Sequence, residues 1–285
     1  DGGVYDGRNE IPGWATPGCE EKGFVSAEVT EGFSDRLTPR YSLPLKVMKD
    51  VKPVSLITTK AGETVIDFGQ IMSGWVEFYC REKEGGEVFF QFGEILQDGN
   101  FYNENLRSAK EEYRYISNGK ERWVRPHFTF YGFRYMKVTG ITELRLEDFI
   151  GRVIYSEMER TGKITTSNWK INQLFQNAFW GQIGNFLDVP TDCPQRDERL
   201  GWTGDAEVFV KAASYNFDVN RFFRKWLADL AADQFAAGSV PLTVPNSFEE
   251  SHVSRAAWSD AATVCPWQMY LTYGAKSLLP AQYGS

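Results

Sequence analysis

The sequence predicts a β domain followed by an all-α domain, and three observations support this. Short runs of Val, Ile, Phe and Tyr, separated by glycine-containing turns, fill residues 51–154 and are typical of strands. Beyond about residue 160 the apolar residues recur at helical spacing instead. The length of 285 residues also fits about two domains.

Residues 1–50 are rich in glycine and proline, and the opening DGGVYDGRNEIPGW alone holds four glycines. This composition predicts irregular structure with one or two strands. We expect the segment to be the tail of an upstream domain. The chain opens on Asp rather than Met, and the helical pattern still runs at Ser285, so we expect both ends to be truncated.

Six strands are expected between residues 51 and 154, and glycine-containing pairs such as Ser73-Gly74 and Asn118-Gly119 are expected to form the turns. Several strands at this spacing predict a β-sandwich or jelly roll. The expected strands are Thr64–Phe68, Trp75–Cys80, Val88–Phe92, Tyr113–Ser117, Trp123–Phe130 and Arg134–Val138.

Four helices are expected in residues 155–285. The clearest is an i, i+3, i+4, i+7 stripe from Val219 to Leu230, which Asp218 is placed to cap. Ser167 is placed to cap the first helix, and Pro266 should bend or locally break the last one. The expected helices are Ile171–Phe186, Ala206–Tyr215, Val219–Leu230 and Ala257–Tyr273.

The connection between the first two helices holds the most unusual stretch, DCPQRDERLGWTGD at residues 192–205. It contains four acids, two arginines, one tryptophan and two glycines. A solvated helix face has no need of Trp202 and two glycines among its charges, and a core segment would not carry six charges. Carboxylates interleaved with Arg and Trp suit a pocket that binds a polyhydroxylated ring and performs acid–base chemistry on it.

Composition argues against several other classes of function. The formal charge of −7 argues against nucleic acid as a partner, and no apolar run reaches the ~18 residues that a membrane span needs. Two histidines and four scattered cysteines predict neither a disulfide framework nor a metal site, and no cofactor is expected. The missing disulfide pattern favours a reducing compartment, with cytoplasm and periplasm both left open. The cysteines are Cys19, Cys80, Cys193 and Cys265.

The longer stretch DVPTDCPQRDERLGWTGDAEVF at residues 188–209 resembles the signature of the bacterial α-L-rhamnosidases, glycoside hydrolase family 78. Segments Thr64–Arg81 and Phe128–Gly140 resemble the family's β-sandwich, and Ala256–Gly274 resembles a helix of its (α/α)6 barrel. The resemblance implies a jelly-roll or β-sandwich domain at residues 51–154. Residues 155–285 would then form the first helices of a six-hairpin barrel, which is incomplete here.

The family cleaves terminal α-linked L-rhamnose with inversion, which uses one carboxyl group as general acid and another as general base, roughly 6.5–9.5 Å apart. The resemblance implies that Glu198 is the general acid. Nearby acids would favour its protonated form, whereas Arg196 and Arg199 would favour the ionised form. The residues implied to bind rhamnose are Asp192, Arg196 and Asp205 at its hydroxyls, with Trp202 and Trp258 as aromatic walls.

The family's general base is a Glu in a later part of the barrel, so we expect it beyond Ser285 and expect this chain alone to be inactive. Glu249 and Glu250 do not match its context and are not assigned the role. The expected partner is a rhamnose-containing oligosaccharide or glycoside, and a homodimer is left open. Two alternatives remain: a carbohydrate-binding protein, and a barrel hydrolase acting on another deoxy sugar. A retained Glu198 argues against the first, because binding alone needs no protonatable group there.

Four further residues have ordinary structural interpretations. Asp197 is equally compatible with a role in the site and with a structural ion pair. Arg199 is interpreted as structural and Cys193 as a small packed group. His252 is interpreted as part of a surface loop rather than of the rim of the sugar site.

Overall fold

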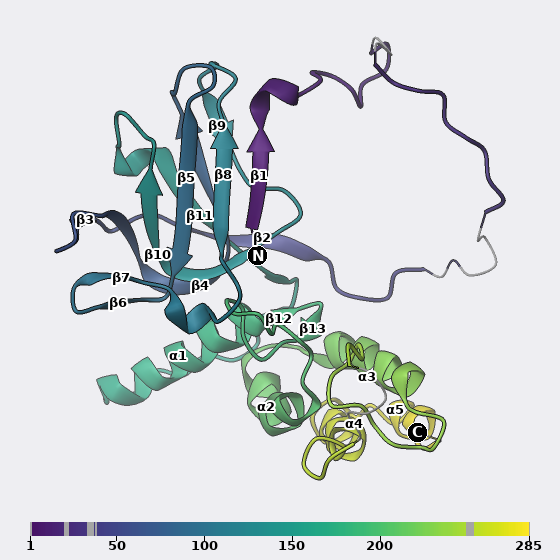
Figure 1. Cartoon of the computed structure of the whole chain (residues 1–285). Coiled ribbons are helices and arrows are strands. Elements are labelled where there is room, and N and C mark those ends of the chain that lie inside the picture. Colours follow the sequence, from purple (N-terminus) through teal and green to yellow (C-terminus); the bar gives the residue numbers. More distant parts are fainter. Residues whose placement is uncertain (1, 20–22, 33–36, 38, 249–253, 285) are drawn as a thin grey trace.

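The computed structural model describes residues 2–19, 23–32, 37, 39–248 and 254–284, which form a β-rich part followed by helices (Figure 1). The strands are β1 (Gly2–Asp6), β2 (Leu45–Val51), β3 (Ser55–Thr58), β4 (Thr64–Cys80), β5 (Glu87–Gly93), β6 (Ile95–Gln97), β7 (Asn100–Tyr102), β8 (Glu112–Ile116), β9 (Arg122–Val124), β10 (Tyr131–Thr139), β11 (Phe149–Ser156), β12 (Phe186–Leu187) and β13 (Val189–Pro190). The helices are α1 (Trp169–Asn185), α2 (Thr203–Asn216), α3 (Asn220–Asp233), α4 (Ala261–Tyr273) and α5 (Leu278–Gln282).

Most strands join one sheet in the order β1-β8-β5-β10-β4-β11-β2, with β3 and β9 also paired to β4. Phe90 on β5 and Phe149 on β11 are three strands apart in this order, yet their ring centroids lie only 6.2 Å apart. A flat sheet would separate them by about 14 Å, because neighbouring strands lie about 4.8 Å apart. The sheet therefore folds over on itself around an aromatic core. Its fully buried large side chains include Tyr113, Tyr115, Tyr131, Phe68, Phe78, Phe90, Phe92, Phe133 and Phe149.

Residues 1–50 contribute β1 and most of β2 to this same sheet. β1 pairs in parallel with β8, from Gly2 opposite Glu112 to Asp6 opposite Ile116. The described residues between β1 and β2 follow a wide arc away from the sheet (Figure 1). The assignment of residues 1–50 to an upstream domain stays a prediction.

The predicted strands Val88–Phe92, Tyr113–Ser117 and Arg134–Val138 correspond to β5, β8 and β10, but the predicted turn at Ser73-Gly74 is wrong. β4 runs through both residues without a break. A Cβ atom at Gly74 would lie 1.8 Å from the carbonyl oxygen of Arg152 on β11, so glycine is required there for close strand approach. The predicted strand at 123–130 is also too long, because β9 ends at Val124.

Two predicted helix starts are also corrected. The cap of α1 is Asn168 rather than Ser167, because the Asn168 side chain accepts a 3.0 Å hydrogen bond from the Lys170 N–H. α2 begins at Thr203, three residues before the predicted start, and this places the end of the 192–205 stretch on a helix.

The two remaining predicted helices are also present. The Asp218 carboxylate accepts a 3.0 Å hydrogen bond from the Asn220 N–H at the start of α3, but Val219 rather than the predicted Asp218 occupies the cap position. α4 begins at Ala261 and runs without a break through Pro266, so the predicted local break is absent. The long apolar face of α3 is buried as its periodicity predicts, through Phe222, Phe223, Trp226, Leu227 and Leu230.

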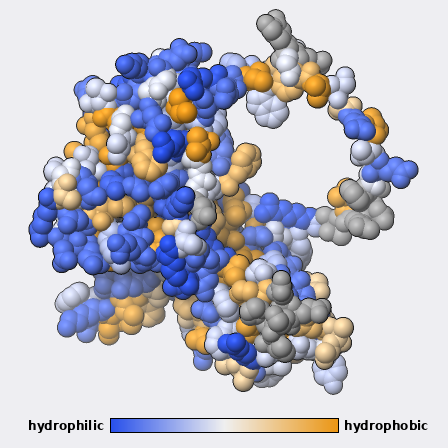
Figure 2. All heavy atoms as spheres, viewed as in Figure 1, coloured by the Kyte–Doolittle hydropathy of each residue, from blue (hydrophilic) through white to orange (hydrophobic). Residues whose placement is uncertain are grey.

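One continuous apolar cluster extends from the sheet into the helices. At the junction the Ser73 hydroxyl, fully buried on β4, donates a 2.6 Å hydrogen bond to the Gly184 carbonyl oxygen near the end of α1. Figure 2 shows mainly hydrophilic residues over the β-rich part, whereas apolar residues also reach the surface among the helices. Within the described residues, the helices are all too short or too polar to cross a bilayer.

Candidate functional site

Two hydrogen bonds join the two ends of segment 192–200, which is called the site loop below. The Asp192 N–H donates to the Leu200 carbonyl oxygen, and the Leu200 N–H donates back to Asp192 Oδ1, each at 3.2 Å. The Asp192 side chain is only 7% exposed. A carboxylate that helps to close its own loop is held in a fixed orientation.

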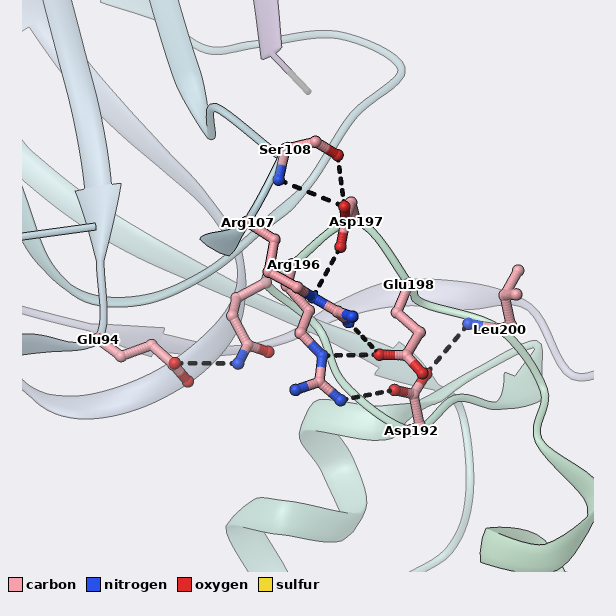
Figure 3. A network of polar contacts seen from close by, with 9 residues as sticks. Glu94, Arg107, Ser108, Asp192, Arg196, Asp197, Glu198 and Leu200 are labelled. Atoms are coloured by element: carbon pink, nitrogen blue, oxygen red, sulfur yellow. Dashed lines mark hydrogen bonds and ion pairs between the residues drawn. The ribbon is translucent and has the colours of Figure 1, made fainter. Parts of the chain in front are cut away.

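Arg196 bridges two acids of the site loop (Figure 3). Its Nε lies 2.8 Å from Glu198 Oε2, and one terminal guanidinium nitrogen lies 3.5 Å from Asp192 Oδ2. One delocalised cation thus holds the carboxylates of Asp192 and Glu198 close together, although like charges repel.

Three residues of the site loop, called the attachment residues below, contact the β domain: Gln195, Asp197 and Arg199. Glu198 contacts both Arg196 and the β-domain residue Arg107. The acid cluster is therefore itself in contact with the β domain.

The β domain supplies a partner for the first two attachment residues. Gln195 Nε2 donates a 3.0 Å hydrogen bond to Glu94 Oε2. Asp197 accepts hydrogen bonds from the backbone N–H and the hydroxyl group of Ser108, and its Oδ1 lies 3.0 Å from Arg107 Nε. The bond from Ser108 is the main cause that lowers the pKa of Asp197, so this carboxylate stays ionised.

Arg199 is the third attachment residue. It donates a 2.9 Å hydrogen bond to the Phe130 carbonyl oxygen, lies 3.3 Å from Glu111 Oε1, and places its guanidinium 4.8 Å from the Phe130 ring. The β domain approaches so closely here that a Cβ atom at Gly132 would lie 2.8 Å from the Gln195 Cβ. Asp197 and Arg199 are thus ion-pair partners of the β domain.

Glu111 is a fully buried acid at this junction. Burial raises its pKa to about 8, although a 3.1 Å hydrogen bond from the Gly132 N–H and the charge of Arg199 oppose the shift. Its second oxygen is buried and has no hydrogen-bond partner among the described residues. Burial also raises the pKa of Glu94, the partner of Gln195.

A cavity of about 560 Å³ lies between α1 and α2, next to the site loop. This volume suits a small ligand such as a sugar ring. Asp205, in the first turn of α2, has a raised pKa because it is partly buried and because the Asp192 carboxylate adds repulsion. The polar or aromatic residues that line the cavity include Gln182, Asn185, Thr191, Asp192, Asp205, Glu207, Phe209 and Trp258.

The structure brings most of the predicted site residues into this region. Asp192, Asp205 and Trp258 line the cavity, and Asp192 contacts the Arg196–Glu198 pair. Trp202 precedes α2, and its ring centroid lies 5.6 Å from that of Phe248 rather than against the cavity residues. The indole nitrogens of Trp202 and Trp258 are buried and lack hydrogen-bond partners within the described part of the chain. Glu249, Glu250 and His252 lie outside the described residues.

The sequence alone did not identify three charged residues of this site: Glu207, Arg107 and Glu111. Glu207 lines the cavity, and burial, followed by the charge of Asp260, raises its pKa. It lies inside the recognised motif, but no spacing marks it. Arg107 and Glu111 belong to an ordinary polar segment of the β domain, and only the folded chain brings them to the site loop.

Asp192, Cys193 and Glu198 could each direct a ligand atom to a metal ion, since these atoms all lie within 4.8 Å of one another. Burial, however, raises the pKa of the Cys193 thiol to about 11, and a metal ligand must be the thiolate. Arg196 already contacts both carboxylates. These contacts favour a charge-paired acid cluster over a metal centre.

The chain is similar to known proteins along nearly its whole length. Residues 57–155 match the bacterial alpha-L-rhamnosidase concanavalin-like domain, and residues 159–285 match the bacterial alpha-L-rhamnosidase 6 hairpin glycosidase domain. An alpha-L-rhamnosidase from Formosa agariphila is 36% identical over 99% of this chain and 31% of its own length.

Two solved structures also resemble it closely. The native rhamnosidase of Aspergillus terreus superposes with a TM-score of 0.95 at 35% identity, covering 99% of this chain and 33% of that one. The Streptomyces avermitilis enzyme complexed with L-rhamnose gives a TM-score of 0.93 at 34% identity, covering 99% of this chain and 28% of that one. The chain therefore spans about a third of the length of the relatives it matches.

Proposed function

This chain belongs to the bacterial α-L-rhamnosidase family, and we propose that the protein it forms hydrolyses terminal α-linked L-rhamnose from rhamnosides with inversion at the anomeric carbon. One observation carries the proposal. Asp192 both lines the cavity and contacts Arg196, and Arg196 contacts Glu198. The acid cluster therefore lies beside a space of about 560 Å³ that can hold a sugar ring.

Glu198 is proposed as the general acid. Its side chain is 21% exposed, so it is reachable by substrate yet partly shielded from water. Protonation of the glycosidic oxygen lets the leaving group depart as a neutral alcohol, and the electron pair of the broken C–O bond stays on that oxygen. The resulting Glu198 carboxylate is stabilised by the Arg196 guanidinium, 2.8 Å away.

The sugar itself is proposed to be held by charged and aromatic groups. Asp192, Arg196 and Asp205 would hydrogen-bond the hydroxyl groups, since bonds to charged partners are stronger than neutral ones. Trp258 lines the cavity and offers an apolar surface to the methyl group of a 6-deoxy sugar. Trp202 is proposed as a second aromatic wall, which requires its indole to be accessible from the cavity.

Inversion also needs a carboxyl group that activates water. The chain spans about a third of the relatives' length, and we propose that this base belongs to the later part of the family's barrel. We likewise propose residues 51–154 and 155–285 as the two domains. The end of β11 at Ser156 and the start of α1 at Trp169 support that division.

The complete gene product should be assayed on p-nitrophenyl α-L-rhamnoside, with proton NMR recording the first anomer of the released sugar. Initial release of β-L-rhamnose is expected. Release of α-L-rhamnose would overturn the inverting mechanism. Turnover of another aryl deoxyglycoside in preference would identify a different sugar, and rhamnose binding without turnover of any glycoside would identify a carbohydrate-binding protein.

A further inference from the structure

We propose that Arg107, supplied by the β domain, is a positioning residue that holds Oε2 of Glu198 so that Oε1 carries the transferable proton. This inference rests on the proposed function and extends it, because it assigns the β domain a part in the proton transfer.

The geometry begins with a bridge between two acids. One terminal nitrogen of Arg107 donates a hydrogen bond to Glu198 Oε2, while its Nε lies 3.0 Å from Asp197 Oδ1 (Figure 3). Asp197 and Glu198 are neighbours in sequence, and the single guanidinium group of Arg107 contacts the carboxylates of both. A planar guanidinium with several fixed donors can do this, whereas a lysine ammonium is a single point charge.

Arg196 contacts the same oxygen of Glu198. Its Nε lies 2.8 Å from Oε2, so two guanidinium groups converge on one atom of the carboxyl group. Within the described residues, no hydrogen bond or ion pair reaches Oε1 of Glu198. An oxygen that accepts a hydrogen bond from one guanidinium group and lies 2.8 Å from a second is the worse site for a proton, which therefore resides on Oε1.

This asymmetry suits a general acid. The O–H bond at Oε1 breaks, the proton passes to the glycosidic oxygen, and the carboxylate charge develops beside two cations that are already in place. Donors fixed where charge develops stabilise a transition state without reorganisation. Arg107 thereby contributes orientation before the transfer and charge stabilisation after it.

Asp197 keeps Arg107 in position. Two bonds from Ser108 fix the Asp197 carboxylate, and its lowered pKa keeps it ionised. The negative charge of Asp197 also offsets part of the positive charge that Arg107 brings to Glu198. Without it, two unopposed guanidinium groups would favour the ionised form of the acid more strongly.

The backbone supports the same assignment. Arg107 has φ 59° and ψ −115°, a conformation that a residue with a side chain rarely adopts. Such strain persists only where the surrounding structure imposes it, and it is frequent at functional sites. Arg107 ends the short 3-10 helix Glu104–Leu106, and this turn directs its side chain at the site loop.

The test compares Arg107→Ala and Arg107→Lys in the complete gene product, with Arg145→Ala as the matched control. Arg145 is an exposed β-domain arginine that pairs only with Glu143 among the described residues. Rates are measured on aryl rhamnosides with leaving groups of graded acidity. Arg107→Ala should lower kcat about 10- to 100-fold on poor leaving groups, a share of the usual effect of a general acid. It should change KM little and have a smaller effect on dinitrophenyl rhamnoside.

Two readouts separate positioning from a structural role. In Arg107→Ala the alkaline limb of the kcat profile should move to higher pH, because loss of the cation favours the protonated acid. Arg107→Lys should keep the limb in place while restoring only part of kcat. In a Glu198→Gln background, Arg107→Ala should add no further loss on the dinitrophenyl substrate, since residues that act as a unit are not additive.

The possible results separate a failure of the inference on Arg107 from a failure of the proposed function. A wild-type protein that is active, with Arg107→Ala indistinguishable from Arg145→Ala, would overturn the inference and leave the proposed function standing. The inference would also be overturned, with the proposed function left standing, if Arg107→Ala added a further loss of rate in the Glu198→Gln background. An alkaline limb of the kcat profile that stays in place in Arg107→Ala would have the same consequence. A wild-type protein without turnover on any aryl rhamnoside would overturn both.

Discussion

Arg199 of the site loop lies 3.3 Å from Oε1 of Glu111, an acid of the β domain with no solvent exposure. Nothing in the local sequence of either residue indicates the other, because 88 positions separate them. The pair holds the site loop against the β domain. Burial at this point disfavours the ionised form of Glu111. The stability of this junction should therefore depend on pH.

Glu111→Gln should stabilise the protein at alkaline pH relative to the wild type. Burial raises the folded-state pKa of Glu111 from 4.5 to about 8, so this group's stabilisation is fully present below pH 4.5 and is lost as pH rises through about 8. The glutamine carries no charge and avoids that loss. The difference in unfolding free energy should grow with pH by at most about 1.4 kcal/mol per unit.

Urea unfolding at pH 5, 7 and 9 measures this difference. Glu112→Gln is the matched control, because the neighbouring Glu112 is only half-buried and bonds Gln91 instead. A Glu111→Gln difference that stays constant with pH would show that Glu111 is ionised throughout, and would remove the physical basis of the prediction.

Glu198→Gln should reduce turnover of natural rhamnosides about 10²- to 10⁴-fold, the usual contribution of a general acid. The glutamine keeps the shape but has no proton to transfer to the glycosidic oxygen. Dinitrophenyl rhamnoside should suffer much less, because its leaving group departs without protonation. Calorimetric titration with rhamnose should show similar affinity; near-normal turnover of a natural rhamnoside would reject the role.

Asp205→Ala should weaken rhamnose binding by roughly 1.5–3 kcal/mol, the range for hydrogen bonds to charged groups. Wild-type affinity should also fall at acid pH. Burial and then the Asp192 charge raise the pKa of Asp205, so its charged form, the stronger acceptor, is present above that pKa and is lost as pH falls. Calorimetry on folded protein tests both points, with Asp50→Ala on β2 as control. Unchanged affinity would assign Asp205 a structural role.

Gly74→Ala and Gly181→Ala should have opposite consequences. The new Cβ at position 74 would lie 1.8 Å from a β11 carbonyl oxygen, so the central strands would have to separate and little folded protein is expected. At position 181, inside α1, a Cβ meets nothing within 4 Å, and alanine should stabilise the helix by about 0.5–1 kcal/mol. Circular dichroism melts compare the two. A normally folded Gly74→Ala variant would contradict the close approach of β4 and β11.

Local patterns predicted the elements that are marked by a clear periodicity. The α3 stripe and the strands at Val88–Phe92 and Tyr113–Ser117 follow from periodicity and side-chain type. The turn predicted at Ser73-Gly74 is wrong because Gly74 is needed for the close approach of β11. That strand lies some 80 residues away in sequence, which no turn pattern can reveal. The pairing of β1 with β8 was missed for the same reason.

The candidate site likewise contains residues that the sequence identified and residues that it did not. The residues of the 192–205 stretch could be identified because their composition is unusual for any packing role. Arg107, Glu94 and Glu111 could not, since their importance arises only where the β domain meets the site loop.

The contacts between the site loop and the β domain also constrain how such proteins can be recombined. A chimera that joined the β domain of one relative to the helices of another would break the contacts of Gln195, Asp197 and Arg199 unless their partners travelled with them. The smallest exchangeable unit is therefore not a domain: it is the site loop together with residues 94–111, the segment between β5 and β8. For the same reason, a substitution at either member of a pair should be compensated at the other across a lineage, even though one lies between strands of the β domain and the other in a loop between helices.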